Sequence, residues 1–157
     1  GVGFVGAVKA NGGQPQGKRA LLVGAGGAGS AIALALVDAG VSELAIHDAD
    51  TARRDSLIER LNSKGKAKVF AGSPDPTGFD LVANATPAGM KPGDALPVEV
   101  DKLSPETFVG CVITVPAISP LIEAARARGC RTSTGTQMYQ ALQNAMVEFL
   151  LAGERIG

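Results

Sequence analysis

Residues 20–40 read ALLVGAGGAGSAIALALVDAG, and this stretch sets the architecture that we expect for the whole chain. The apolar run at 21–23 predicts a buried strand, and the alanine-rich segment at 30–39 predicts a helix. The glycine-rich segment at 24–29 joins them and has the pattern G-x-G-x-x-G. That pattern alone is common, but a strand before it and a helix after it are typical of a dinucleotide-binding turn. The alternative is a glycine-rich turn in an ordinary α/β protein.

Each glycine of this pattern has a separate expected role. Gly24 would make the tight turn, Gly26 would let a pyrophosphate approach the backbone, and Gly29 would let helix and strand pack closely. The first N–H groups of a helix have no partner within the helix, so they would face the phosphates. The motif therefore predicts a dinucleotide-binding site at this turn.

The composition fits one domain with a single core, because domains of about 100 to 200 residues are usual and 45% of the 157 residues are hydrophobic. Fifteen Lys and Arg side chains balance fifteen Asp and Glu side chains, so no field of one sign steers the chain toward nucleic acid or a membrane surface. No apolar run is long enough to span a bilayer, and residues 1–10 lack the pattern of a secretory signal. We therefore expect no nucleic-acid partner, no membrane partner and a cytoplasmic location.

The two cysteines, Cys111 and Cys130, have neither metal-ligand spacing nor a disulfide-rich setting. We interpret both as reduced core or loop residues, with a catalytic thiol as the alternative. We expect no metal site.

Strand patterns alternate with helix patterns along the rest of the chain, which predicts an α/β fold with one doubly wound parallel sheet of the Rossmann type. Residues 1–157 would form a single domain. We expect Asp50 and Ser119 to be helix N-caps, with Pro120 at the first helical position. Strands are expected near 20–23, 43–47, 66–70, 79–84, 109–115 and 131–133, and helices over 1–8, 30–39, 51–64, 120–128 and 136–151, with a long loop at 92–105.

The carboxyl ends of these strands define the expected ligand site. In doubly wound sheets, ligands bind outside the carboxyl ends of the strands, at the point where the strand order reverses. This rule brings the Gly24 turn, Asp48, the loop at 84–90 and the end of the fifth strand to one crevice. Asp48 follows the second strand, where an acidic side chain can accept hydrogen bonds from the ribose hydroxyls of adenosine.

Five motifs occur in the order seen in the shikimate and quinate dehydrogenases, and the chain resembles this family from end to end. The resemblance implies reversible hydride transfer between a nicotinamide cofactor and a shikimate-like or quinate-like cyclic acid, with aromatic amino-acid biosynthesis as the associated pathway. The most specific motif is NAT-x-x-GM. The five are Gly1-Val2-Gly3-Phe4, the GAGGAG turn at 24–29, Asn84-Ala85-Thr86-x-x-Gly89-Met90, Pro116 with Ser119-Pro120-Leu121, and Gly135-x-x-Met138.

The resemblance also implies that the chain is the cofactor-binding half of a longer enzyme. In the family, a preceding substrate domain carries a catalytic pair of lysine and aspartate. We therefore nominate no catalytic residue in this chain, and we expect the chain alone to be inactive.

The cofactor contacts follow from matching the motifs. For Asn84 and Thr86 the alternative is turn chemistry after a strand, and for Met138 it is core filling. By the resemblance, Gly24, Ala25, Gly26, Gly27 and Ala28 would hold the pyrophosphate, Asn84, Ala85 and Thr86 would line the route to the nicotinamide, and Val112, Gly135 and Met138 would lie near that ring.

The residues after the second strand predict that NAD is preferred and that NADP is the less favoured cofactor. Carboxylates at Asp48 and Asp50 would repel the 2′-phosphate of NADP, and the stretch Asp48-x-Asp50-Thr51-x-Arg53 resembles the NAD-preferring members of the family. Arg53 matches an arginine of the NADP pattern, with a solvated helix residue as the alternative. Asp50 is more readily explained as a helix N-cap than as a ribose contact. The prediction therefore depends on Asp48.

The chain departs from the family pattern on the substrate side. Cys111 and Thr114 replace an aspartate and a substrate-binding tyrosine of the strand after the long loop. Leu142 replaces a substrate-binding glutamine, and Gln143 lies one place later, about 100° around a helix. Thr114 and Gln143 are the substrate-site candidates, and the identity of the small-molecule substrate is left open.

Two other classes of function remain open at this point. The chain could be a dinucleotide-sensing module without catalysis, or it could belong to another Rossmann reductase, such as a relative of folate or glutamyl-tRNA reductases. A homodimer is also left open.

Overall fold

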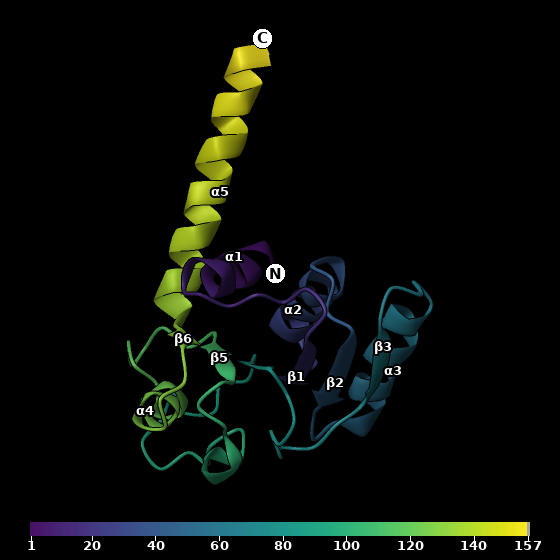
Figure 1. Cartoon of the computed structure of the whole chain (residues 1–157), viewed down its shortest axis with the longest axis vertical. Coiled ribbons are helices and arrows are strands. Elements are labelled where there is room, and N and C mark those ends of the chain that lie inside the picture. The colour runs from purple at the N-terminus through teal and green to yellow at the C-terminus, as the bar shows by residue number, and fades with distance from the viewer. Residues whose placement is uncertain (157) are drawn as a thin grey trace.

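The computed structural model describes residues 1–156, which form a sheet with helices on both of its sides (Figure 1). The strands are β1 (Arg19–Val23), β2 (Glu43–His47), β3 (Lys68–Ala71), β4 (Leu81–Asn84), β5 (Phe108–Cys111) and β6 (Thr132–Ser133). The helices are α1 (Val2–Ala10), α2 (Gly27–Asp38), α3 (Thr51–Asn62), α4 (Pro120–Ala127) and α5 (Gly135–Ile156), and Val100–Lys102 forms a short 3₁₀ helix, η1.

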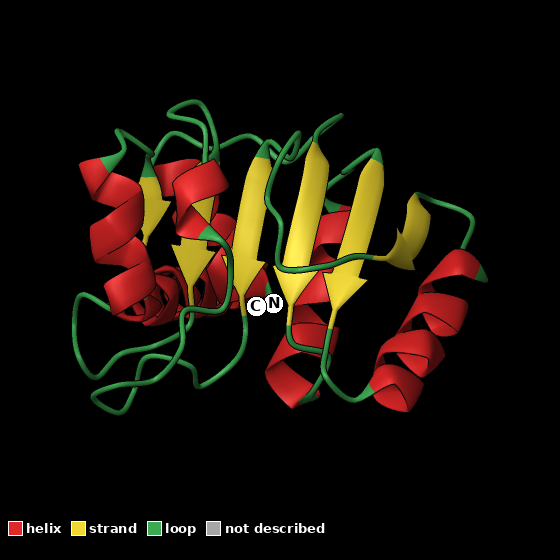
Figure 2. Ribbon diagram, turned by 90° about the horizontal axis from the view of Figure 1, so that it is seen from below, coloured by secondary structure: helices red, strands yellow, loops and turns green. Residues whose placement is uncertain are grey.

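The sheet has the order β3-β2-β1-β4-β5-β6, and each neighbouring pair is parallel. The arrows of the strands accordingly point the same way in Figure 2. The chain moves outward from β1 to β3 and then crosses back to place β4 on the other side of β1. The predicted doubly wound parallel sheet is confirmed, and the strand order reverses between β1 and β4, beside the glycine turn.

The side chains of β1 alternate between two apolar clusters, one on each face of the sheet. Ala20 and Leu22 pack with residues of α1, α2 and α3. Leu21 and Val23 pack with residues of α4 and the segment that includes η1. None of the four is more than 4% exposed. Burial on both faces explains why this strand is an unbroken apolar run rather than an alternating one.

Two helices begin at the caps that the sequence predicts. The Asp50 carboxylate accepts a hydrogen bond from the backbone N–H of Arg53 at 3.0 Å, at the start of α3. The Ser119 hydroxyl accepts one from the N–H of Ile122 at 3.3 Å, and Pro120 is the first residue of α4. Both predicted N-caps are therefore confirmed.

The fifth strand is shorter than the expected 109–115. It ends at Cys111, which lies opposite Asn84, the last residue of β4. Neither neighbouring strand continues beyond this level, so residues 112–118 leave the sheet as a loop. The apolar pattern alone could not show this, because it continues past the last available partner.

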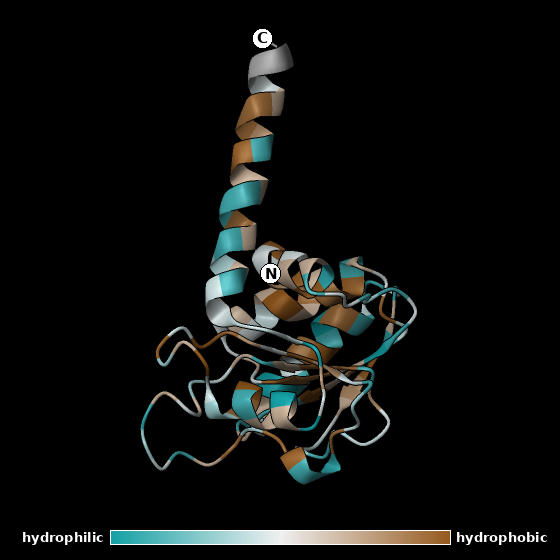
Figure 3. Cartoon of the chain, turned by 60° about the vertical axis from the view of Figure 1, so that its left-hand side comes forward, coloured by the Kyte–Doolittle hydropathy of each residue, from teal (hydrophilic) through white to brown (hydrophobic). Residues whose placement is uncertain are grey.

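The last helix is longer than the expected 136–151. It starts at Gly135, after a capping box in which Thr134 and Gln137 each accept a hydrogen bond from the other's backbone N–H. It packs against α1 near its beginning and then projects away from the body of the protein (Figure 1). Hydrophobic and hydrophilic segments alternate along the projecting part (Figure 3). Several of its large apolar side chains are exposed, among them Met146, Phe149 and Leu150.

Candidate functional site

A crevice lies at the carboxyl ends of β1, β2 and β4, where the strand order reverses. It encloses a cavity of about 900 Å³. The second strand contributes His47 and the Asp48 that follows it, α3 contributes Arg53, and the turn after β4 contributes Thr86. The topology therefore brings together segments that are far apart in the sequence, as the strand-end rule predicts.

The glycine turn lies between Asp48 and Thr86 at this site, and the fold explains only two of its three motif glycines. Gly24 has a φ of 105°, which side chains rarely adopt. A Cβ at Gly29 would overlap the carbonyl oxygen of Gly24, so the close packing of helix and strand requires glycine there. Gly26 has an extended backbone, and a Cβ there would come no closer than 3.7 Å to another side chain, Arg53.

The space beside Gly26 therefore faces outward rather than into the protein. A Cβ at Gly27 would meet nothing within 4 Å, and both Gly27 and Ala28 are exposed. The helix α2 begins at Gly27, inside the motif rather than at residue 30, so its first N–H groups lie at this surface. The turn leaves room for a phosphate group close to the backbone, at the positive end of a helix.

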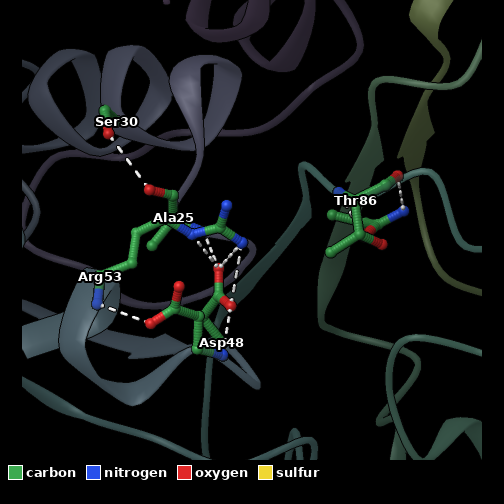
Figure 4. A network of polar contacts seen from close by, with 7 residues as sticks. Ala25, Ser30, Asp48, Arg53 and Thr86 are labelled. Atoms are coloured by element: carbon green, nitrogen blue, oxygen red, sulfur yellow. Dashed lines mark hydrogen bonds and ion pairs between the residues drawn. The ribbon is translucent and has the colours of Figure 1, made fainter.

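Asp48 lies beside the glycine turn and is held by three protein groups. Its carboxylate accepts hydrogen bonds from the N–H of Ala25 at 2.7 Å and of Asp50 at 2.8 Å. The Arg53 guanidinium donates to both carboxylate oxygens, at 3.0 and 2.8 Å through Nη2, and Nε adds a contact of 3.2 Å (Figure 4). The side chain of Asp48 is 5% exposed, whereas that of Arg53 is 52% exposed.

This environment fixes the charge of Asp48. Burial raises the pKa of the Asp48 carboxyl, but the N–H groups of Ala25 and Asp50 and the Arg53 guanidinium outweigh burial, and the pKa lies below its usual value. The carboxylate is therefore ionised at neutral pH and already paired. The sequence predicts a negative charge at this position on the adenosine side. It does not predict Arg53 as the partner of Asp48, because an ion pair across the start of a helix depends on the direction of both side chains.

The turn after β4 forms the opposite wall of the crevice, and it is organised by a buried amide. Asn84 is fully buried, and its Oδ1 accepts hydrogen bonds from the N–H and the hydroxyl of Thr86, at 3.0 and 2.7 Å. The Thr86 hydroxyl in turn accepts a bond from the N–H of Ala88 at 3.2 Å. These are the contacts of a polar turn, so the turn-chemistry alternative describes Asn84 correctly, while Thr86 also lines the crevice.

The remaining predicted site residues fall into three groups. Val112 and Gly135 lie in contact beyond the end of β5. A Cβ built on Gly135 would overlap the carbonyl oxygen of Val112. Met138 is partly buried and packs on the core, which agrees with core filling. Thr114 and Gln143 are both exposed, the first in the loop after β5 and the second on α5.

Sequence reasoning missed several residues that line the crevice. Pro74 comes from the loop after β3, and Leu96 and Pro97 come from the long loop after β4. No local pattern marks them, because they reach the site only through the folding of long loops. Met90, which also lines the crevice, is part of the NAT-x-x-GM motif and could have been found from it.

No group of three or more His, Cys, Asp or Glu side chains in residues 1–156 is arranged to hold a metal ion. None of the helices formed by these residues is both long and apolar enough to span a bilayer.

The fold and the crevice together define a dinucleotide-binding α/β domain of the Rossmann type. No protein-family model matches the chain. Curated proteins do match it: a quinate/shikimate dehydrogenase (NAD(+)) of Corynebacterium glutamicum is 38% identical over 136 residues, which are 82% of this chain and 47% of that protein. A shikimate dehydrogenase (NADP(+)) of Rubrobacter xylanophilus is 39% identical over 150 residues, 91% of this chain and 53% of that protein.

Solved structures give the same result. Quinate dehydrogenase from Corynebacterium glutamicum in complex with NAD has a TM-score of 0.79 at 34% identity, covering 90% of this chain and 53% of that one. The ligand-free 5-ketofructose reductase of Gluconobacter sp. strain CHM43 has a TM-score of 0.80 at 36% identity, covering 88% of this chain and 52% of that one. The chain is therefore a relative of the shikimate and quinate dehydrogenases, and it spans about half the length of the curated relatives it matches.

Proposed function

We propose that this chain is the NAD(P)-binding half of an oxidoreductase that transfers hydride between a nicotinamide cofactor and a hydroxy or keto cyclic acid resembling shikimate or quinate. The observation that carries the proposal is the open backbone at Gly26 and Gly27, at the beginning of α2 and at the switch point of the sheet. The cofactor would supply the hydride chemistry, and these residues would bind and orient it. Substrate contacts and acid–base groups would come from a second domain, of the kind that the resemblance implies.

The topology of the sheet indicates where each end of the cofactor would lie. The pyrophosphate would lie against residues 24–28, with adenosine over β2 beside Asp48 and the nicotinamide over β4 and β5 beside Thr86. Val112 and Gly135, beyond the end of β5, would approach the ring. Met138 packs against the apolar cluster but is only partly buried, so it remains a candidate for contact with the ring.

We propose further that NAD is preferred to NADP. The Arg53 guanidinium is already engaged by Asp48, so a 2′-phosphate would have to compete with this carboxylate for it. Asp50 adds a second negative charge close by, although its carboxylate also caps α3. Since Arg53 offsets one of the two carboxylates, we expect a modest preference of about three- to tenfold rather than exclusion of NADP.

A keto sugar is the second candidate substrate. It is favoured by the similarity to 5-ketofructose reductase and by Thr114 and Leu142, which stand where the family has a substrate-binding tyrosine and glutamine. A shorter side chain at residue 114 would leave room for a different ring or an open chain. Thr114 and Gln143 remain the candidates for substrate contact on this half.

Calorimetry and a hydride-transfer assay test the proposal. We expect the chain to bind NAD but not to oxidise shikimate, quinate or a polyol, because the acid–base pair would lie outside it. Turnover by this chain alone would contradict the proposed division of labour. Binding without any turnover in the full natural protein would favour a sensing module instead, and sedimentation of the same samples would decide whether a homodimer forms.

A further inference from the structure

A buried chain of polar side chains connects the beginning of α4 to the turn at the nicotinamide side of the crevice. Asn84 donates through Nδ2 to the sulfur of Cys111 at 3.4 Å, and the Ser119 hydroxyl donates to the same sulfur at 3.5 Å. Exposure is 0% for Asn84, 1% for Cys111 and 1% for Ser119. On the other side, Asn84 holds the N–H and hydroxyl of Thr86 through Oδ1.

The register of the sheet creates this contact. Asn84 and Cys111 are the last residues of β4 and β5, and they lie directly opposite each other. Their side chains leave the sheet at the same level, and Ser119 reaches them as the N-cap of α4. Because the N–H of Ile122 donates to the Ser119 hydroxyl, the hydroxyl proton is free to point at the sulfur.

The backbone of Thr86 fixes which way round the Asn84 amide lies, and the Cys111 sulfur adds an acceptor for Nδ2 in that orientation. In the observed orientation, Nδ2 donates to Cys111 and to the carbonyl of Thr86, and Oδ1 accepts two bonds from Thr86. The reversed amide would direct Nδ2 at the N–H of Thr86, and two donors would face each other without an acceptor. A buried amide left in this state costs free energy, so the observed orientation is the stable one, and the sulfur of Cys111 stabilises it further as the second acceptor for Nδ2.

The position of Thr86 in turn determines the shape of the crevice wall that it lines. Its hydroxyl is occupied by Asn84 and by the N–H of Ala88. Its methyl group lies close to Gly24, since a Cβ built on that glycine would be only 3.0 Å from it. The turn after β4 therefore packs against the glycine turn. Any loosening of Thr86 would change the surface between the pyrophosphate and the nicotinamide.

We propose that Cys111 and Ser119 are positioning residues for the nicotinamide end of the dinucleotide and that they act through Asn84 on the turn at Thr86. Neither of them lines the crevice among the described residues, so their effect is indirect. The proposal rests on the proposed function for its ligand, but the network itself can be tested without any ligand.

The experiment compares Cys111→Ala with Cys130→Ala, which truncates the other buried cysteine. Cys130 lies away from the crevice and donates to the carbonyl oxygen of Ser104 at 3.2 Å. The first readout is hydrogen exchange at the amides of Thr86 and Ala88 in the free protein. The second is the ratio of the affinities for NAD and for ADP, because ADP lacks only the nicotinamide riboside.

We expect Cys111→Ala to speed exchange at both amides and to lower the NAD to ADP affinity ratio by about 3- to 10-fold. Cys111→Ser retains an acceptor and should restore most of the ratio, and Cys130→Ala should leave the ratio unchanged. If Cys111→Ala does not fold, Thr86→Val removes the hydroxyl within a similar shape and should lower the same ratio.

Three results would overturn the proposal: unchanged exchange at both amides in Cys111→Ala, equal losses of NAD and ADP affinity, or a parent protein that binds NAD no better than ADP. A parent that binds neither nucleotide would instead reject the proposed function. The exchange measurement would then still decide whether the network holds the turn.

Discussion

The two walls of the crevice are built on different chemistry. The adenosine side is charged and reaches the surface, because the buried Asp48 carboxylate is paired with an Arg53 guanidinium that is half exposed. On the nicotinamide side, Thr86 is backed by a neutral and buried network of Asn84, Cys111 and Ser119. The comparison teaches that the Asp48–Arg53 pair can select a ligand by charge, whereas the network behind Thr86 can hold a surface of fixed shape.

The largest effect is expected at the glycine turn that separates these walls. A valine at Gly26 would fit the protein but would fill the space that the pyrophosphate needs. Gly26→Val should therefore lower NAD affinity by at least about 100-fold while the free energy of unfolding changes by about 1 kcal/mol or less. Calorimetry and urea unfolding measure the two quantities.

Gly29→Ala is the contrasting control for this change. Its Cβ would overlap the backbone of Gly24, so it should lower stability by about 3 kcal/mol or more. If the Gly26→Val protein bound NAD as tightly as the parent, the assignment of the pyrophosphate to this turn would be contradicted.

The nicotinamide side is tested by two asparagines that both bond to backbone groups, the buried Asn84 and the exposed Asn62. Asn62 bridges the backbone of Val69 with bonds of 2.9 and 3.1 Å, far from the crevice. Asn84→Ala should lower stability by about 1–3 kcal/mol, because its partners are buried, and Asn62→Ala by about 0.5–1.5 kcal/mol, because water can replace its bonds. Only Asn84→Ala should also lower NAD affinity, by about tenfold, and equal effects of the two on binding would show that Asn84 serves the fold alone.

The charged wall is tested by the choice of cofactor. Asp48→Asn removes one negative charge and frees the Arg53 guanidinium for a 2′-phosphate, so NADP affinity relative to NAD should rise about tenfold. Asp50→Asn is the matched control, because asparagine is also a good N-cap and should preserve α3. The affinities are measured at fixed ionic strength. If Asp48→Asn does not raise the affinity for NADP relative to NAD, Asp48 does not determine the choice of cofactor.

The last prediction concerns stability against acid. The pKa of Asp48 is lowered in the folded protein, so its stabilising contribution is complete above the unfolded value of about 3.9 and is lost as the pH falls through the folded value. The parent should exceed Asp48→Asn in stability by about 1–3 kcal/mol at pH 7, and this difference should shrink below about pH 4. A difference that stays constant from pH 7 to pH 3 would contradict the ionic contribution.

Most of the fold could be predicted from the sequence, because the apolar runs and the helix caps are local signals. The glycine turn, the Asp50 cap and the Ser119 cap all follow from residues within a few positions of one another. The end of β5 could not be predicted, since it depends on where the neighbouring strand β4 stops. The pairing of Arg53 with Asp48 and the contact between Asn84 and Cys111 were also missed, because each depends on the direction of side chains from different elements.

The most direct test of the crevice as the ligand site is an NMR titration of the isotopically labelled chain with NAD. We expect the amide signals of Gly26, Gly27, Ala28 and Thr86 to shift with one common affinity. A second hollow, beside α1 and lined by Gly12, Phe108 and Arg131, provides the internal control, and its signals should not move. Shifts confined to that hollow, or none at residues 26–28, would contradict the assignment of the crevice as the dinucleotide site.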